Sequence, residues 1–150
     1  MALDQSFVGR TYPATEPYEV GREKIREFAE AIGDTNPAYT DPEAARALGH
    51  PDVIAPPTFV FAITYRAAGQ VVTDPQLGLD FSRVVHGDQQ FAYTRPVRAG
   101  DRLSATSTIE VIKSLAGNDV LTIRGEVHDQ HGEHVVTTHM KLVARAAEEA

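Results

Sequence analysis

Apolar residues in the first half of the chain recur with helical spacing. Within residues 21–32 they stand at positions i, i+3, i+4 and i+7, which predicts a short amphipathic helix that ends at Gly33. An N-cap and a first-turn proline follow at Asp41 and Pro42. A second short helix is therefore expected before Gly49.

A third helix-like segment is apolar on nearly every side. Residues 58–72 contain one charged side chain, Arg66, and one weak helix former, Gly69. Because a helix of this kind is normally buried on most of its faces, residues 58–72 are predicted to form a central core helix.

The second half of the chain has the alternation of β-strands. Val, Ile, Thr and Tyr are interleaved with polar residues in five segments: 83–85, 89–94, 103–112, 120–127 and 135–143. Gly-rich turn clusters separate the longer segments, which predicts one antiparallel sheet of long, curved hairpins. A long sheet wrapped around one buried helix fits this order best, so we expect a single α+β domain over residues 1–150.

Composition narrows the classes of function. The 150 residues carry a formal net charge of −7, which disfavours nucleic acid and anionic lipid as partners. The chain has no cysteine, which excludes disulfides and thiolate metal sites. No signal-like apolar segment and no run of about 18 apolar residues occurs, so we expect a cytoplasmic protein that does not span a membrane.

A short motif after the first helix carries a family resemblance. Residues 33–39, Gly-Asp-Thr-Asn-Pro-Ala-Tyr, resemble the Gly-Asp-x-Asn-Pro-x-His motif of the MaoC-like hydratases and dehydratases. Residues 54–59 and 91–101 are also similar to segments of that family, and the resemblance covers most of the chain. It implies the hot-dog fold, a curved antiparallel sheet around a helix, in agreement with the hydrophobic pattern.

The resemblance implies chemistry on acyl thioesters. Members of the family hydrate enoyl thioesters or dehydrate 3-hydroxyacyl thioesters, and the motif aspartate and histidine handle the water and its proton. The chain keeps Asp34 and Asn36, but Tyr39 stands where the family has histidine. Because the unperturbed pKa of tyrosine is about 10, Tyr39 is a poor substitute for an imidazole at neutral pH.

A second departure concerns the group that polarises the thioester carbonyl. In the family this group is a backbone N–H at the start of the central helix, and Pro57 aligns with the glycine that supplies it. Proline has no N–H. A shifted alignment would bring the amide of Thr58 or Phe59 into this role, and a helix N-terminus still offers free N–H groups. We expect Asn36, Tyr39, Pro57, Thr58 and Phe59 to line the substrate site, with Asp34 as the retained or vestigial catalytic residue.

Both departures are typical of one subset of the family. It comprises the non-catalytic subunits of actinobacterial heterodimeric 3-hydroxyacyl-thioester dehydratases and the first half of FAS1-like dehydratases. In such pairs the partner supplies the aspartate and histidine, while the other chain shapes the acyl channel. The resemblance therefore favours a subunit that binds an acyl-CoA or acyl carrier protein thioester and forms a heterodimer with a catalytic MaoC-like chain, or a homodimer.

Two alternatives remain open. One is a self-sufficient (R)-specific enoyl-CoA hydratase that uses Asp34 with Tyr39 or His86. The other is a non-enzymatic acyl-ligand binding or regulatory module, in which Asp34 and Asn36 are only turn residues. A thioesterase ranks lower, because residues 57–72 hold no carboxylate to activate water.

The remaining histidines suggest no metal site. His86 and Gln89 lie in a segment that resembles the same subset of the family, and both are expected to contact substrate. His128, His131 and His134 recur every third residue, but the turn signal at residues 130–132 argues against a metal-binding helix face. We expect neither a metal nor a cofactor.

Overall fold

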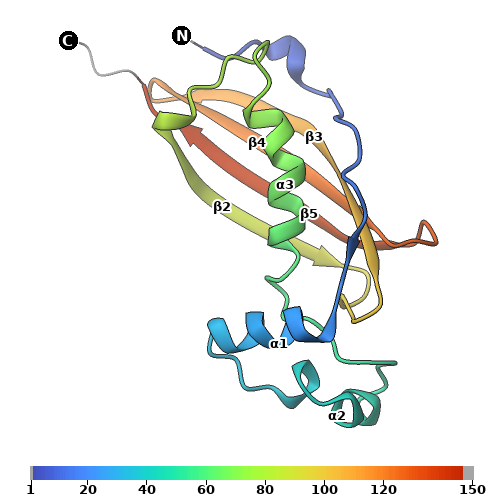
Figure 1. Cartoon of the computed structure of the whole chain (residues 1–150). Coiled ribbons are helices and arrows are strands. Elements are labelled where there is room, and N and C mark those ends of the chain that lie inside the picture. Colours follow the sequence, from blue (N-terminus) through green and yellow to red (C-terminus); the bar gives the residue numbers. More distant parts are fainter. Residues whose placement is uncertain (1, 147–150) are drawn as a thin grey trace.

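Five antiparallel strands form one curled sheet in the computed structural model, which describes residues 2–146 (Figure 1). They are β1 (Tyr18–Glu19), β2 (Val84–Tyr93), β3 (Arg102–Leu115), β4 (Asn118–His128) and β5 (His134–Ala144). Their order across the sheet is β1-β3-β4-β5-β2. The predicted curved antiparallel sheet is confirmed.

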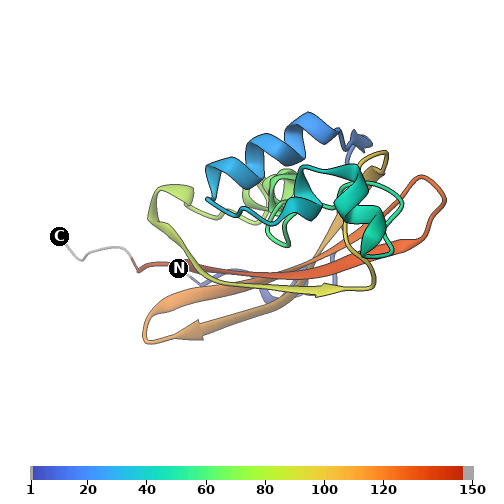
Figure 2. The same ribbon diagram turned by 90° about the horizontal axis from the view of Figure 1, so that it is seen from below.

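The three α-helices lie on one face of this sheet (Figure 2). They are α1 (Arg22–Ala31), α2 (Pro42–Ala47) and α3 (Phe61–Val72), and three 3-10 turns cover Gln5–Phe7, Pro37–Tyr39 and Phe81–Arg83. None of the helices in residues 2–146 has the length and apolar character needed to cross a bilayer.

The central helix differs in two ways from its prediction. α3 begins at Phe61, three residues late, because the preceding loop forms turns and the Phe59 amide donates to the Pro56 carbonyl at 2.9 Å. α3 is also not buried on most of its faces. One face of the helix, which includes Ile63 and Ala67, is buried in the core, whereas Tyr65 is 52% exposed.

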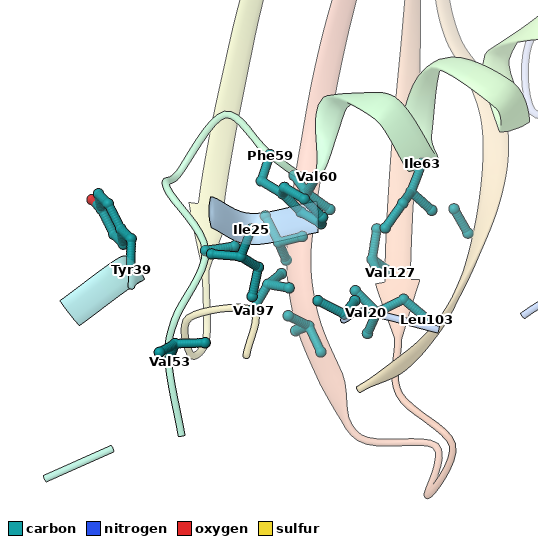
Figure 3. Close-up of a cluster of buried hydrophobic side chains, with 14 of the residues drawn as sticks. Val20, Ile25, Tyr39, Val53, Phe59, Val60, Ile63, Val97, Leu103 and Val127 are labelled. Atoms are coloured by element: carbon teal, nitrogen blue, oxygen red, sulfur yellow. The ribbon is translucent and has the colours of Figure 1, made fainter. Parts of the chain in front are cut away.

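The apolar core lies between the helices and the concave face of the sheet. Alternate residues of β3 point inward, so that Leu103, Ala105 and Ile109 are fully buried. Leu103 and Ala105 pack with residues of α1 and α3, and Ile109 packs in a second cluster with residues of α3. Figure 3 shows the part of this core around Ile25, Phe59 and Val60. The sheet face opposite the helices is polar.

A glycine leaves room for a buried threonine of the next strand beneath α3. A Cβ atom at Gly125 of β4 would stand 2.5 Å from Oγ1 of Thr138 in β5, whereas it would lie 3.6 Å from Cγ2 of Thr64 in α3, an ordinary contact distance. Thr64 and Thr138 are both buried. Only a hydrogen atom therefore fits at position 125 unless Thr138 moves.

The two segments predicted at residues 83–85 and 89–94 are one strand. β2 pairs with β5 along its whole length, and the register shifts between His86 and Asp88. Gly87 lies in this β-bulge, which explains why the apolar alternation breaks there.

The two edges of the sheet differ. Residues 9–19 run along the outer edge of β3, with backbone bonds such as Tyr12 N–H to Ser107 carbonyl at 2.9 Å and with the β1 pairing. On the other side, β2 pairs only with β5 among the described residues. β2 is therefore the open edge of the sheet.

The close approach at Gly125 yields a stability prediction. Gly125→Ala is expected to lower the free energy of unfolding by about 1–3 kcal/mol, because Thr138 or α3 must shift. Gly69→Ala is the matched control: nothing lies within 4 Å of its Cβ, and alanine favours a helix interior, so stability should rise by up to about 1 kcal/mol. Urea unfolding measures both variants, and an unchanged Gly125→Ala midpoint would contradict the tight packing of Thr138 against Gly125.

Candidate functional site

The motif segment leaves α1 through a chain of local hydrogen bonds. Gly33 adopts a positive φ of 72°, which ends the helix. The Asp34 side chain then accepts from the Asn36 amide at 3.1 Å, and the Asn36 side chain accepts from the Ala38 amide at 3.1 Å. Both motif side chains therefore act as turn and cap acceptors that position Tyr39.

Tyr39 lies at the boundary of the core. It is 7% exposed, and its hydroxyl points away from the apolar cluster in Figure 3. Burial raises the pKa of Tyr39, the negative charge of Asp34 adds to this rise, and hydrogen bonding with Asn36 opposes it. The phenol therefore stays protonated at neutral pH, where it can donate a hydrogen bond but not accept a proton as a base.

A cavity of 340 Å³ opens beside Tyr39. It is lined by the loop before α3 and the end of β2: Tyr39, Ile54, Ala55, Pro57, Tyr93, Thr94, Arg95 and Pro96. The lining is mainly apolar with a few polar groups, as is usual for small-molecule sites. The structure thus brings Tyr39 and Pro57 together, with Asp34 and Asn36 behind Tyr39.

The loop before α3 is fixed by a tyrosine that the sequence analysis did not single out. The Tyr93 hydroxyl donates to the Pro57 carbonyl, and burial raises the pKa of Tyr93, so this donor stays protonated. The Phe59 amide is already bonded to Pro56, whereas the Thr58 amide has no partner in residues 2–146. Thr58 is therefore an unpaired backbone donor before α3, but it is not among the residues that line the cavity, contrary to its prediction.

Phe59 has a different place from the one expected. Its side chain is 2% exposed and lies in the core, where its ring centroid is 5.4 Å from that of Phe28 and 6.4 Å from that of Tyr18. It supports α1 against the start of α3 and does not line the cavity. A buried aromatic residue and a pocket residue look the same in the sequence.

Arg95, at the cavity wall, is held by two buried carboxylates. Its guanidinium donates to both oxygens of Asp101 at 2.9 Å and to Asp129 at 3.0 Å. Hydrogen bonding to Asp101 raises the pKa of Arg95 despite its burial. Burial alone would raise the pKa of Asp129, but the Glu133 and His131 amides and Arg95 lower it. Sequence reasoning missed Asp129, which lies in a turn with no motif around it.

His86 and Gln89 lie elsewhere. The His86 ring stacks on Phe61 of α3 with centroids 5.6 Å apart, and His86 Nε2 is 3.1 Å from Oε1 of Gln89. His86 and Tyr93 are seven positions apart on β2, roughly 20 Å at the rise of a strand. Within one chain, His86 therefore does not reach the cavity that Tyr39 lines.

No histidine replaces the missing imidazole within this chain. All six histidines fall in the part that the structure describes, and none of them lines the cavity. His134 instead bonds Thr94, Thr137 and Glu126 on the polar face of the sheet. Residues 2–146 also contain no group of three side chains arranged to hold a metal ion.

Comparison with known proteins identifies the family. A family model described as FAS1-like, dehydratase domain region, matches residues 6–138. The chain belongs to this family. A UPF0336 protein of Streptomyces avermitilis is 83% identical to this FAS1-like dehydratase-region chain over 149 residues, 99% of each protein. A UPF0336 protein of Streptomyces coelicolor is 81% identical over 150 residues and covers both chains fully.

Solved structures agree with this assignment. The FAS1-like chain is similar to the HadBC (3R-hydroxyacyl-ACP dehydratase) complex from Mycobacterium tuberculosis, with 32% identity and a TM-score of 0.81 over 91% of this chain and 96% of that one. A MaoC-like dehydratase gives 32% identity and a TM-score of 0.88 over 96% of this chain, which spans 44% of that protein. The hot-dog fold and the MaoC-like resemblance are both confirmed.

The buried ion cluster yields a prediction about pH. Asp129→Asn is expected to lower the free energy of unfolding at pH 7 by about 3 kcal/mol, because Arg95 loses a buried partner. Since the folded-state pKa of Asp129 is lowered, its stabilising effect is present above the unfolded pKa of about 3.9 and is lost as pH falls through the folded value.

The difference between the wild-type protein and Asp129→Asn should therefore be largest at neutral pH and shrink in acid. Urea unfolding across the acid range measures this difference. Asp88→Asn, on the exposed part of β2, serves as the control. A constant difference at all pH values would contradict the ion-cluster account.

Proposed function

We propose that this chain is the acyl-thioester-binding subunit of a 3-hydroxyacyl-CoA or 3-hydroxyacyl-ACP dehydratase or enoyl hydratase, and that a catalytic partner completes it. One observation carries the proposal: the residue at the motif histidine position, Tyr39, lines the cavity, and no histidine of the chain lines it. The site has the shape and polarity of a binding site but lacks its usual proton carrier.

Binding and turnover need different chemical groups at this site. Hydration adds a hydroxyl group to C3 of an enoyl thioester and a proton to C2, which requires a group that can accept and return a proton near neutral pH. Tyr39 stays protonated there. Its hydroxyl, at the cavity wall, can donate a hydrogen bond to a thioester carbonyl.

The open edge of the sheet supports a partnered form. β2 presents ten residues of strand without a second neighbour in the described chain, and such an edge favours pairing with another strand. A relative at 32% identity belongs to a protein described as a complex. We infer that β2 pairs with the equivalent strand of a second hot-dog chain, either a catalytic chain or another copy.

One observation disfavours a self-sufficient hydratase. The side chains of Asp34 and Asn36 each accept a hydrogen bond from the backbone amide two residues later. This structural role is enough to account for the presence of both residues. The same bonds are compatible with a non-enzymatic acyl-ligand binding module. The dehydratase subunit and the binding module differ in the effect of a catalytic partner, which should raise the rate of hydration only for the subunit.

Hydration of crotonyl-CoA tests the proposal. The purified chain should show almost no turnover, and co-expression with a chain that carries an intact Gly-Asp-x-Asn-Pro-x-His motif should raise the rate by at least about 100-fold, the usual contribution of acid–base catalysis. Asp34→Asn in this chain keeps a side-chain oxygen that can accept from the Asn36 amide but removes the carboxylate, and it should leave the activity of the complex unchanged.

Three outcomes would contradict the proposal. Robust turnover by the isolated chain that is lost in Asp34→Ala would favour the self-sufficient hydratase. Failure to form a heterodimer, together with no gain in rate, would favour the binding module. A complex that loses activity with Asp34→Asn, which keeps the turn acceptor, would show that this carboxylate takes part in the reaction.

A further inference from the structure

Thr94 lines the cavity and is also bonded to a histidine that lies outside it. It follows the end of β2, where it is exposed, and its Oγ1 is 2.6 Å from Nδ1 of His134 at the start of β5. The two residues meet because β2 and β5 pair antiparallel, with Tyr93 opposite Val136. Figure 1 shows β2 ending at the same end of the sheet as the β4–β5 turn. His134 therefore approaches the cavity through the hydroxyl group of Thr94.

The other ring nitrogen of His134 is held by a carboxylate. Nε2 lies 3.1 Å from Oε2 of Glu126 in β4 and 2.8 Å from Oγ1 of Thr137. Thr137 donates its own hydroxyl hydrogen to the same oxygen of Glu126 at 2.7 Å, and Nε of Arg124 lies 3.4 Å from the other oxygen. The imidazole is thereby fixed in one orientation from both of its nitrogens.

These bonds determine which nitrogen of the neutral imidazole carries the hydrogen. An ionised carboxylate only accepts hydrogen bonds, and the hydroxyl hydrogen of Thr137 already goes to Glu126, so neither neighbour donates to Nε2. Nε2 therefore carries the hydrogen, and Nδ1 presents its lone pair to the Thr94 hydroxyl. A hydroxyl group that donates to an imidazole backed by a carboxylate is the arrangement that activates a nucleophile.

We infer that Thr94, His134 and Glu126 form a catalytic triad that hydrolyses an ester or thioester of a short acyl group. The Thr94 oxygen attacks the carbonyl carbon, and its proton passes to Nδ1 of His134. The bond to the leaving thiol or alcohol then breaks, the leaving group takes that proton, and the acyl group remains on Thr94 as an ester. Water that gives a proton to His134 attacks this ester, which releases the carboxylic acid and restores the Thr94 hydroxyl.

The cavity supplies the other parts of such a site. Tyr39 lines it together with Thr94, and its phenol stays protonated because its pKa is raised, so it can donate to the negatively charged oxygen of the tetrahedral intermediate. Ile54, Ala55 and Pro57 form apolar walls for an acyl chain, and the volume of 340 Å³ suits a short one.

This activity goes beyond the proposed function. Hydration of a double bond needs a proton carrier that touches the water or the substrate, whereas His134 touches Thr94. The triad therefore does not replace the motif histidine, and it needs no partner chain. The sequence analysis ranked a thioesterase lower because residues 57–72 hold no carboxylate, but the structure brings one from β4 to the imidazole of β5.

Hydrolysis of butyryl-CoA by the isolated chain tests the inference. Butyryl-CoA has no double bond to hydrate, and the chain has no cysteine, so a thiol reagent measures only the coenzyme A that hydrolysis releases. The wild-type chain should release it about 100-fold faster than Thr94→Val, which keeps the shape of the side chain but lacks the hydroxyl. Thr94→Ser keeps the hydroxyl and should stay within about tenfold of the wild-type rate.

Thr122→Val is the matched control. It removes a hydroxyl group from β4 at a position that does not line the cavity, so the rate should equal that of the wild-type chain. Wild-type hydrolysis no faster than that of Thr94→Val, or equal losses in Thr122→Val and Thr94→Val, would overturn the triad.

Mass spectrometry of the acylated protein gives a readout that does not depend on the folding of a variant. Brief reaction with p-nitrophenyl butyrate, followed by an acid quench, should add one butyryl group to the wild-type chain at residue 94. A butyryl group only at other residues, or none, would overturn the inference. Hydrolysis at Thr94 in a chain that forms no complex with a motif-bearing partner would instead contradict the proposed function and support the triad.

Discussion

The seating of α3 on the curled sheet is the constraint on which the rest of the structure depends. Gly125 of β4 leaves room for the buried side chain of Thr138 in β5, and α3 lies over the same place at ordinary contact distance through Thr64. The loop that leads into α3 is thereby brought to the end of β2, where Tyr93 binds its carbonyl. The cavity exists because these two segments are held together, and Arg95 is fixed beside them by two buried carboxylates.

The site has the loops and apolar walls of a binding cavity but lacks part of the reacting groups. The motif turn, the free amide before α3 and the apolar walls are present, whereas the position of the proton carrier holds a phenol with a raised pKa. Hydrogen-bond donation and proton transfer need different pKa values, so the phenol of Tyr39 can serve the first and not the second. The open β2 edge and the exposed aromatic residues beside it are consistent with a chain that completes its function in an assembly.

Much of this was predictable from local sequence. The helices, the strand-rich second half and the position of Tyr39 follow from periodicity, capping residues and a short motif. The bulge at Gly87, the edge formed by residues 9–19 and the pairing of Arg95 with Asp129 depend on contacts between segments far apart in the sequence. The positions of Phe59 and His86 could not be predicted either. The sequence does not distinguish a core side chain from one that lines a cavity, and it does not show which end of a strand lies beside the site.

The central claim is that this cavity lacks the imidazole that would carry the proton. The most direct test is crotonyl-CoA hydration by the isolated Tyr39→His variant as a function of pH. The account predicts turnover about 100-fold above that of the wild-type chain, with a pH dependence centred near the imidazole pKa of about 6.5. A folded variant as inactive as the wild-type chain at every pH would contradict it.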